Sequence, residues 1–323
     1  MIISRTPFRI SLAGGGTDLA AFYRKGPGAV VSTAIDKYMY VTVNKYFDDS
    51  IILKYSKTEL VKRVADVRHP ILRECLKLTG LTRGIEVTSM ADVVGGTGLG
   101  SSSSFTVGVL HALHAYKGEY CTAEQLAREA CEIEISRLKE PIGKQDQYIA
   151  AYGGFRHLEF MPNETVRVDP LIFPEDVSSR LRERLVLLYT GVRRRAGPLL
   201  RRFQARFTAK ADVLAAMRGL AEQARRELQK GNVDAIGELL HEGWRLKKSV
   251  TGGISNAAID RAYEAARRSG ARGGKILGAG GGGFLLLFCP PQKRRAVVSA
   301  LQGWRDIPFR FEQEGSKIIY VSR

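Results

Sequence analysis

Residues 95–104 read Gly-Gly-Thr-Gly-Leu-Gly-Ser-Ser-Ser-Ser, and apolar residues of helical spacing follow them at Phe105, Val109, Leu113 and Tyr116. Serine hydroxyls at the start of such a pattern can cap the unpaired N–H groups of a first helical turn, so we expect a helix to begin here. Glycine lets the backbone approach a ligand closely, and a helix N-terminus attracts anions. The stretch therefore predicts a glycine-rich loop that opens a helix and can hold phosphate.

Two other glycine-rich segments lie far from this one along the chain: residues 13–18 read Ala-Gly-Gly-Gly-Thr-Asp, and residues 278–284 read Gly-Ala-Gly-Gly-Gly-Gly-Phe. None of the three is a Walker A loop, because no Gly-Lys-Ser/Thr follows at the right spacing. The dinucleotide fingerprint is imperfect too, since Ser101 stands where its third glycine belongs. Each segment alone is compatible with a structural turn. Together, and with serines that can bind a metal, they favour a site for nucleotide phosphates.

Two acidic residues in the middle of the chain are candidates for chemistry. A capping box at Thr122–Gln125 predicts a helix to about Leu138, and Glu134 falls on its mostly apolar face, where an unpaired carboxylate is costly. Glu134 can be paired with Arg137, or it can bind Mg²⁺ through its oxygens. Asp146 follows a Pro-x-Gly turn, and the spacing alone does not choose between a helix cap and a catalytic group.

The order of predicted elements indicates an α+β protein of two parts. Strands are expected at residues 2–12, 37–46, 84–90, 155–160, 166–171 and 185–190. Long helices are expected at 198–230, 233–248 and 257–268, then a glycine-rich strand pair at 275–289, a final helix and a closing hairpin. This change from mostly strands to mostly long helices predicts domains at residues 1–180 and 181–323.

Charge and composition admit two interpretations. The 323 residues include 50 Lys and Arg against 33 Asp and Glu, a formal net charge of +17. Clustered cations can bind nucleic acid, but no helix-turn-helix, RNP or zinc-finger pattern accompanies them, so we favour a basic surface and an anionic substrate. The longest apolar run, residues 284–289, is far short of the ~20 residues of a membrane helix, and the N-terminus lacks the apolar stretch of a signal peptide. We expect a cytoplasmic protein with neither a nucleic-acid nor a membrane partner.

The three glycine segments, in this order, resemble the three motifs of the GHMP kinase superfamily. Its first motif is similar to residues 7–18 (Pro-Phe-Arg-Ile-Ser-Leu-Ala-Gly-Gly-Gly-Thr-Asp), its phosphate loop to residues 98–104 and its third motif to residues 278–284. The resemblance implies a two-lobed α+β fold, with an N-terminal lobe like the second domain of ribosomal protein S5 and a ferredoxin-like C-terminal lobe. It also implies ATP and Mg²⁺ as cofactors and an active site between the lobes. Val94 and Gly95 stand where the family usually has prolines, which predicts a more flexible loop entrance.

The resemblance assigns roles residue by residue. Asp146 would face the acceptor hydroxyl as base or orienting group, and Arg9 would neutralise charge near the transferred phosphoryl group. Ser102 and Glu134 would bind Mg²⁺. Contacts to the nucleotide would come from Gly96, Gly98, Leu99, Gly100, Ser101, Ser102 and Ser103. Contacts to the acceptor would come from Gly15, Gly16, Thr17, Asp18, Lys144, Arg193, Gly280 and Gly281.

More closely, the chain is similar to the sugar-1-kinase branch that acts on D-glycero-D-manno-heptose 7-phosphate, through residues 140–148, 240–248 and 252–256. This implies formation of the 1,7-bisphosphate and ADP, which feeds nucleotide-activated heptose for capsule, S-layer or lipopolysaccharide glycans. A phosphorylated acceptor needs cations, and the candidates are Lys144, the three arginines 193–195, Lys247 and Lys248. A fucokinase- or galactokinase-like enzyme, a non-catalytic sugar sensor and a homodimeric assembly stay open.

Overall fold

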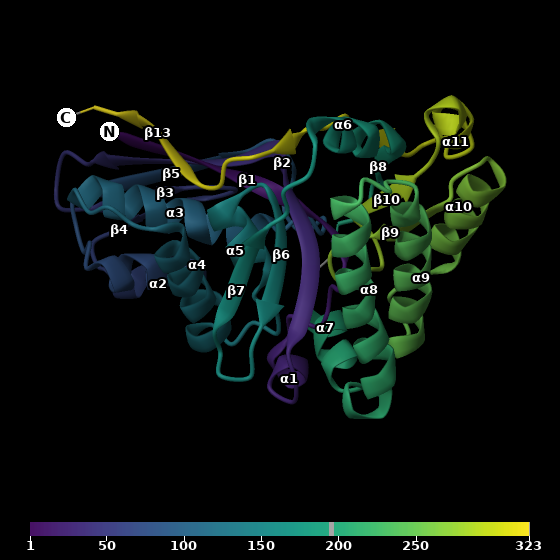
Figure 1. Cartoon of the computed structure of the whole chain (residues 1–323). Helices are drawn as coiled ribbons and strands as arrows, with labels where there is room; N and C mark the ends of the chain where they lie inside the picture. The colour runs from purple at the N-terminus through teal and green to yellow at the C-terminus, as the bar shows by residue number, and fades with distance from the viewer. Residues whose placement is uncertain (194–196, 323) are drawn as a thin grey trace.

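The computed structural model describes residues 1–193 and 197–322. Their strands form a large sheet and a small sheet (Figure 1). In the large sheet the strand order is β13-β1-β2-β5-β3-β4, and β2 also pairs with β6, which pairs with β7, and with β12. Neighbouring strands are antiparallel apart from β3 and β5. The strands are β1 (Ile2–Ala13), β2 (Gly28–Lys45), β3 (Ile51–Lys54), β4 (Thr58–Val61), β5 (Ile85–Ala91), β6 (Phe155–Phe160), β7 (Val166–Pro170), β12 (Phe311–Glu312) and β13 (Lys317–Val321).

Helices cover the face of this sheet that lies below it in Figure 1. The central one, α3 (Ser101–Lys117), packs on β1 and β2 through fully buried residues such as Val107 and Leu110. The prediction that a helix begins at the serines is confirmed. Around it lie α2 (Pro70–Thr79), α4 (Ala123–Cys131) and α5 (Gln145–Tyr152), with the short elements α1 (Ala20–Tyr23) and η1 (Val64–Asp66).

The small sheet has the order β11-β8-β10-β9 and a helical layer with its own core around Trp244 and Tyr263. Two of its helices, α8 and α9, also pack on β1, so they join the two halves of the molecule. Its strands are β8 (Leu185–Tyr189), β9 (Gly273–Ile276), β10 (Phe284–Phe288) and β11 (Arg305–Asp306). Its helices are α6 (Glu175–Arg184), α7 (Gly197–Gln204), η3 (Thr208–Lys210), α8 (Ala211–Gln229), α9 (Ala235–Val250), α10 (Ala257–Arg268), η4 (Pro291–Lys293) and α11 (Arg294–Ser299).

The end of the chain returns to the large sheet, where N- and C-terminus lie side by side (Figure 1). Strand β13 pairs with β1 and β12 pairs with β2, so the predicted closing hairpin is wrong. The reason is a tertiary contact: Gly154, after α5, donates its N–H to the carbonyl of Glu312 at 3.0 Å and holds β12 against β2. The division at residues 180/181 stays a prediction, and two strands that follow it belong to the first sheet.

Two helices differ from their predicted form. The expected helix 198–230 is divided into α7, η3 and α8, because the chain turns at residues 205–207 between the buried rings of Phe203 and Phe207. The helix from Thr122 has the predicted cap, since the Gln125 N–H donates to the Thr122 hydroxyl at 3.1 Å. After Cys131, however, it continues as a π-helix, η2 (Glu132–Arg137). Such wide turns are rare and frequently occur at functional sites.

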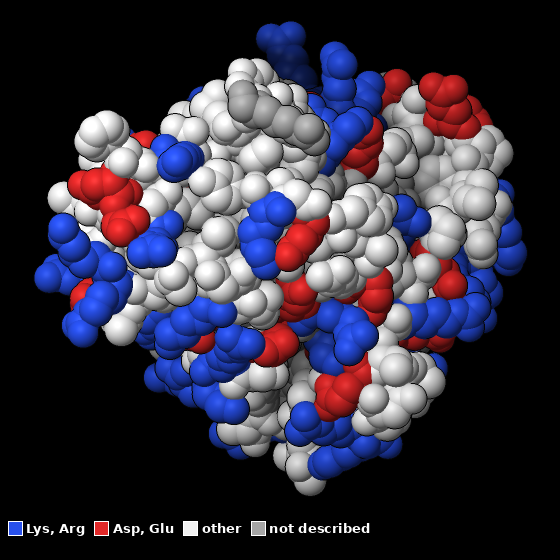
Figure 2. All heavy atoms as spheres, turned by 90° about the vertical axis from the view of Figure 1, so that its left-hand side faces the viewer, with Lys and Arg blue, Asp and Glu red and all other residues white. Residues whose placement is uncertain are grey.

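On the face that Figure 2 shows, which belongs to the side of β3 and β4, acidic side chains lie among the basic ones. Two ion pairs involve residues in β3 or just after β4: Arg63 pairs with Asp66 at 2.8 Å, and Lys54 pairs with Glu86 at 2.6 Å. The excess positive charge is therefore not gathered into one continuous basic patch on this face. In the described part of the chain, no helix has both the length and the apolar composition needed to cross a bilayer.

Candidate active site

A cavity of about 670 Å³ lies where the three glycine-rich segments meet. Arg9, Gly15, Gly16 and Asp18 come from β1 and the turn after it, and residues 96–103 come from the loop that opens α3. The third segment contributes Gly278, Ala279 and Gly282, and Leu277, directly before it, lines the cavity too. Residues as distant in the sequence as Arg9, Gly100 and Gly282 thus border one space, as the sequence predicted.

Glycine is required where the loop contacts the other segments. A Cβ atom on Gly98 would lie 2.4 Å from the Leu277 carbonyl oxygen, and the φ of Gly98 is +88°. A Cβ on Gly100, whose φ is +77°, would lie 3.3 Å from both the Arg9 side chain and Asp146. Both positions combine a left-handed backbone with a crowded approach that other residues tolerate poorly. The close packing holds the loop against the other two segments.

Asp146 lies in the first turn of α5, where the helix dipole favours a carboxylate. Arg9 holds it in a two-pronged ion pair: Nε donates to Oδ1 and Nη2 donates to Oδ2, both at 2.7 Å. Arg9 Nη1 donates to the carbonyl of Gly98 at 2.5 Å. The Arg9 side chain is 5% exposed, whereas that of Asp146 is 26% exposed. The arginine is therefore a buried clamp that fixes an accessible carboxylate relative to the phosphate loop.

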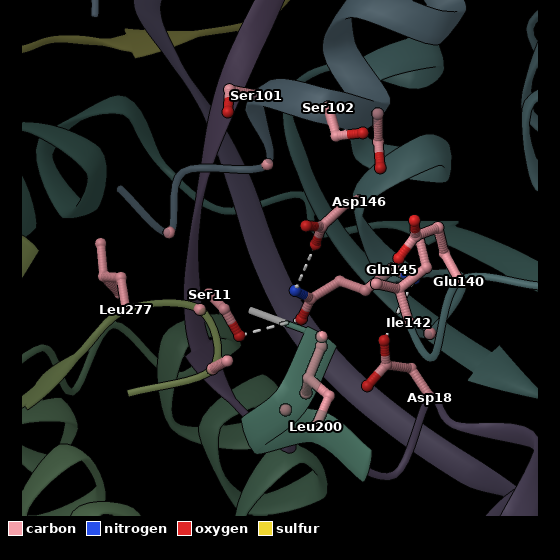
Figure 3. Close-up of a pocket in the computed structure, with 18 of the residues that line it drawn as sticks. Ser11, Asp18, Ser101, Ser102, Glu140, Ile142, Gln145, Asp146, Leu200 and Leu277 are labelled. Carbon is pink, nitrogen blue, oxygen red and sulfur yellow. Dashed lines mark hydrogen bonds between the residues drawn. The ribbon is translucent and has the colours of Figure 1, made fainter. Parts of the chain in front are cut away.

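Gln145 connects the carboxylates of this site, as Figure 3 shows. Its side chain accepts a hydrogen bond from the Ser11 hydroxyl at 2.9 Å and donates to Asp146 Oδ1 at 3.1 Å. Its backbone N–H donates to Asp18 Oδ2 at 3.3 Å, and Gly16 N–H donates to Asp18 Oδ1 at 2.9 Å. Burial, and then the negative charge of Asp146, raise the pKa of Asp18. Two carboxylates are thus held at fixed positions on one wall of the cavity.

Glu134 and Ser102 provide oxygen ligands on the other side of the loop. The π-helix places Glu134 with 1% of its surface exposed, where it accepts hydrogen bonds from the Ser102 hydroxyl and, at 2.7 Å, from Gln147. Burial raises its pKa to about 7, although the hydrogen bonds act in the opposite direction. Arg137, the alternative partner, pairs with Glu132 at 2.5 Å instead.

The chemistry of this donor set fits Mg²⁺. Among the described residues no cation forms an ion pair with Glu134, and the Oε1 atom of its neighbour Gln147 is buried without a hydrogen-bond partner. A divalent cation would supply the missing positive charge, and carboxylate and hydroxyl oxygens are ligands that Mg²⁺ accepts. Glu134 and Ser102 are therefore the residues that would hold the metal.

The loop residues predicted to bind nucleotide lie at the cavity, with one exception. Gly96, Gly98, Gly100, Ser101, Ser102 and Ser103 line it, whereas Leu99 is fully buried and its carbonyl accepts the Arg9 N–H at 3.1 Å. The serines do not cap α3 as expected. Gly100 is the N-cap, and the hydroxyls bond elsewhere, such as Ser104 to the Pro7 carbonyl at 2.8 Å. The N–H groups of the first turn stay available to an anion.

The residues predicted to bind the acceptor are only partly gathered there. Gly15, Gly16 and Asp18 line the cavity, but Thr17 is buried, and its hydroxyl donates to the Gly14 and Ala29 carbonyls, both at 2.9 Å. Gly280 and Gly281 pack against Ile254 and do not line the cavity, whereas Ala279 and Gly282 on either side of them do.

The predicted cations are mostly engaged elsewhere. Lys144 pairs with Glu164 at 2.7 Å, and Lys248 pairs with Asp260 at 3.0 Å. Arg193 donates to the Gly95 carbonyl at 3.3 Å and does not line the cavity. Arg194 and Arg195 lie outside the described residues. Lys247 does line it and donates to the Gly278 carbonyl.

Gln145, Arg201 and Lys275 are among the cavity residues for which the sequence predicted no role. Gln145 stands next to Asp146, but nothing in the sequence indicates that its side chain connects Ser11 to that carboxylate. Lys275 gave a signal in the sequence, since it directly precedes the apolar residues Ile276 and Leu277, and a lysine in a buried strand needs a partner for its charge. Arg201 follows a run of basic residues and gave no signal of its own.

Comparisons with known proteins agree with this geometry. Residues 45–154 match the family model for the GHMP kinases N terminal domain, and residues 224–304 match the one for GHMP kinases C terminal. The chain is 32% identical to the D-glycero-alpha-D-manno-heptose 7-phosphate kinase of Campylobacter jejuni, over 98% of both chains. It is 25% identical to the bifunctional fucokinase/GDP-fucose pyrophosphorylase of Arabidopsis thaliana, over 85% of this chain and 28% of that one. A crystal structure titled D-glycero-D-manno-heptose 1-phosphate kinase, from Bacteroides thetaiotaomicron, matches with a TM-score of 0.84 and 25% identity over 100% of both chains.

Proposed function

Because this chain belongs to the GHMP kinase family and is a sugar kinase, we propose that it transfers the γ-phosphoryl group of ATP to the anomeric hydroxyl of D-glycero-D-manno-heptose 7-phosphate. The observation that carries the acceptor's identity is the 32% identity over 98% of both chains with a heptose 7-phosphate kinase. The products would be the 1,7-bisphosphate and ADP. The 1,7-bisphosphate would be a precursor of the nucleotide-activated heptose used for capsule, S-layer or lipopolysaccharide glycans.

Phosphoryl transfer depends chiefly on positioning and on compensation of charge. The N–H groups at the start of α3 would bind the triphosphate, and Asp18 would accept hydrogen bonds from sugar hydroxyls. Asp146, held by Arg9, would orient the anomeric hydroxyl and take its proton as the new O–P bond forms. Mg²⁺, when bound by Glu134 and Ser102, supplies charge neutralisation at the phosphates.

The acceptor's own phosphate needs a cation that the protein has not already paired. Arg201 on α7 lines the cavity and, among the described residues, forms no ion pair. Its planar fork suits phosphate oxygens. Lys144, by contrast, is paired with Glu164 and lies over the ring of Tyr23. We therefore assign the acceptor's phosphate to Arg201 in preference to Lys144.

A substrate panel tests the proposal. ADP release is measured with ATP, Mg²⁺ and each of heptose 7-phosphate, heptose 1-phosphate, unphosphorylated heptose, L-fucose and D-galactose. We expect kcat/KM to be highest for heptose 7-phosphate, and Arg201→Gln to reduce that preference over unphosphorylated heptose by ~10-fold or more, as the loss of a charge-assisted contact would. Equal or better turnover of heptose 1-phosphate or of a free sugar would refute the acceptor assignment.

A further inference from the structure

The transferred phosphoryl group needs a cation, and the expected one is already engaged. Three N–H donors of Arg9 are directed to protein oxygens: two to Asp146 and one to the Gly98 carbonyl. Its charge is therefore balanced by Asp146 before any substrate binds. Since charge develops on the phosphoryl oxygens during transfer, an effective site places a further positive group there.

Lys275 is a cation of this kind. It lies in the middle of β9, opposite Leu286 of β10, and its side chain reaches the cavity lining although the residue is only 8% exposed. Among the residues that the structure describes, its ammonium group forms neither a hydrogen bond nor an ion pair. A buried ammonium without an acceptor is costly, which indicates that an anion completes this site.

The charges around Lys275 locate that anion. Arg9, Lys247 and Asp18 all interact electrostatically with its ammonium group. Arg9 and Lys247 are bonded to Gly98 and Gly278, the glycines at which the phosphate loop meets the third segment. Asp18 belongs to the wall proposed for the acceptor. Lys275 therefore interacts electrostatically with groups on both the donor side and the acceptor side of the cavity that it lines.

We propose that Lys275 is a catalytic residue whose ammonium group contacts the phosphoryl group as it passes from ATP to the acceptor. The bond between the γ-phosphorus and the β,γ-bridging oxygen breaks, and its electrons stay on ADP. The bond between phosphorus and the acceptor oxygen forms, and the hydroxyl proton goes to Asp146. Lys275 keeps its proton and donates hydrogen bonds to the non-bridging oxygens. This inference rests on the phosphoryl transfer of the proposed function and not on the identity of the acceptor.

The surroundings of Lys275 agree with a role that begins when substrate binds. Burial, and then the positive charges of Lys247 and Arg9, hold the pKa of Lys275 well below its ordinary value, while Asp18 acts in the opposite direction. A phosphate anion would add a negative charge and favour the ammonium form. The free protein carries an electrostatic cost that the substrate removes, as is common in active sites.

The variant Lys275→Met tests this inference, because it keeps the aliphatic chain and removes the charge. It is assayed with whichever acceptor the wild-type enzyme turns over, so a failed acceptor assignment does not affect the test. We expect kcat to fall by ~10²–10³-fold, the usual effect of removing one preorganised donor, with KM values within ~3-fold. Thermal unfolding without ligands should occur at the same temperature as in wild type or higher, because an unpaired buried charge is gone.

Two comparisons make the outcome specific to the phosphoryl group. ADP with aluminium fluoride imitates the group in transfer, and its inhibition in the presence of acceptor should weaken in Lys275→Met by a factor similar to the loss in kcat. Lys230→Gln, a change of charge at the exposed end of α8, is the control and should alter neither quantity. A kcat near that of wild type, a loss confined to the KM of a phosphorylated acceptor, or a lower unfolding temperature would each overturn the proposal.

Discussion

Replacement of Asp146 by asparagine perturbs the centre of the proposed chemistry with little change of shape. Asparagine keeps one oxygen and replaces the other with an amide nitrogen, which cannot accept a hydrogen bond. One of the two Arg9 donors, each 2.7 Å from the carboxylate, then loses its acceptor. The contact between Arg9 and the Gly98 carbonyl is not altered directly.

The structure gives the size of the expected effects. Breaking a fully buried ion pair costs about 3–5 kcal/mol, but Asp146 is 26% exposed and solvent screens part of the pair. We therefore expect the free energy of unfolding to fall by ~1–3 kcal/mol. Loss of a positioned proton acceptor typically lowers a rate by about 10²–10⁴-fold. We expect kcat to fall by that factor while the KM for ATP changes by less than ~3-fold, because the N–H groups of the phosphate loop are retained.

Activity is measured by ADP release at saturating substrates, and stability by equilibrium unfolding in urea. The matched control is Asp66→Asn, because Arg63 holds Asp66 in a similar fork at 2.9 and 2.8 Å but at the protein surface. This control should change neither kcat nor the urea midpoint measurably. If Asp146→Asn kept more than a tenth of wild-type kcat, Asp146 would be neither the proton acceptor nor the group that orients the hydroxyl.

Three further predictions concern other parts of the molecule. Glu134→Gln should lower Mg²⁺-dependent kcat by ~10²-fold or more. Because the pKa of Glu134 is raised from 4.5 to about 7, the folded metal-free wild type binds one more proton than the unfolded chain between these pH values. Its free energy of unfolding should therefore fall by roughly 3 kcal/mol from pH 4.5 to pH 7, and the variant should lack that fall in urea titrations. Parallel curves of stability against pH for both proteins would contradict the assignment of Glu134 as a buried carboxylate. Gly98→Ala places a Cβ 2.4 Å from the Leu277 carbonyl, so it should cost ~1–3 kcal/mol in calorimetry and weaken ATP binding, and an unchanged ATP affinity would show that this contact does not shape the loop. Hydrogen bonds to two carboxylates raise the pKa of His114 above 6.5. The stabilisation that they provide is therefore complete below pH 6.5 and is lost as the pH rises through the folded-state pKa. His114→Gln should destabilise the protein more at pH 5.5 than at pH 9 in urea titrations, and an equal effect at both pH values would exclude a charged imidazole.

Patterns within short segments predicted much of the fold. Helix α10 has the predicted bounds, residues 257–268, because a capping Asn256 and an amphipathic repeat are both local signals. The break between α7 and α8 was not predictable in this way, since the apolar spacing continues on both sides of it. The pairing of β12 and β13 depends on contacts more than 270 residues away in the sequence, so no local pattern could reveal it.

The difference between local patterns and contacts of distant residues also explains what could be predicted of the candidate active site. The glycine segments identified the cavity because glycine permits backbone that other residues cannot adopt, and that requirement is visible in the sequence. The clamp between Arg9 and Asp146 joins residues 137 positions apart, so only the folded chain shows that this arginine is engaged. For the same reason the sequence does not show that Lys144, two positions before Asp146, pairs with Glu164 and does not line the cavity.

In the proposed reaction a sugar phosphate and ATP meet in this cavity, and the new phosphate ester forms at the anomeric carbon. Proton-coupled ³¹P NMR of the reaction mixture with ATP, Mg²⁺ and heptose 7-phosphate tests it directly. We predict a new sugar phosphate signal split into a doublet by the anomeric proton, with the 7-phosphate signal retained and one ADP formed for each product molecule. ADP formation without that doublet, or a new ester on any other carbon, would contradict phosphorylation of the anomeric hydroxyl in this cavity.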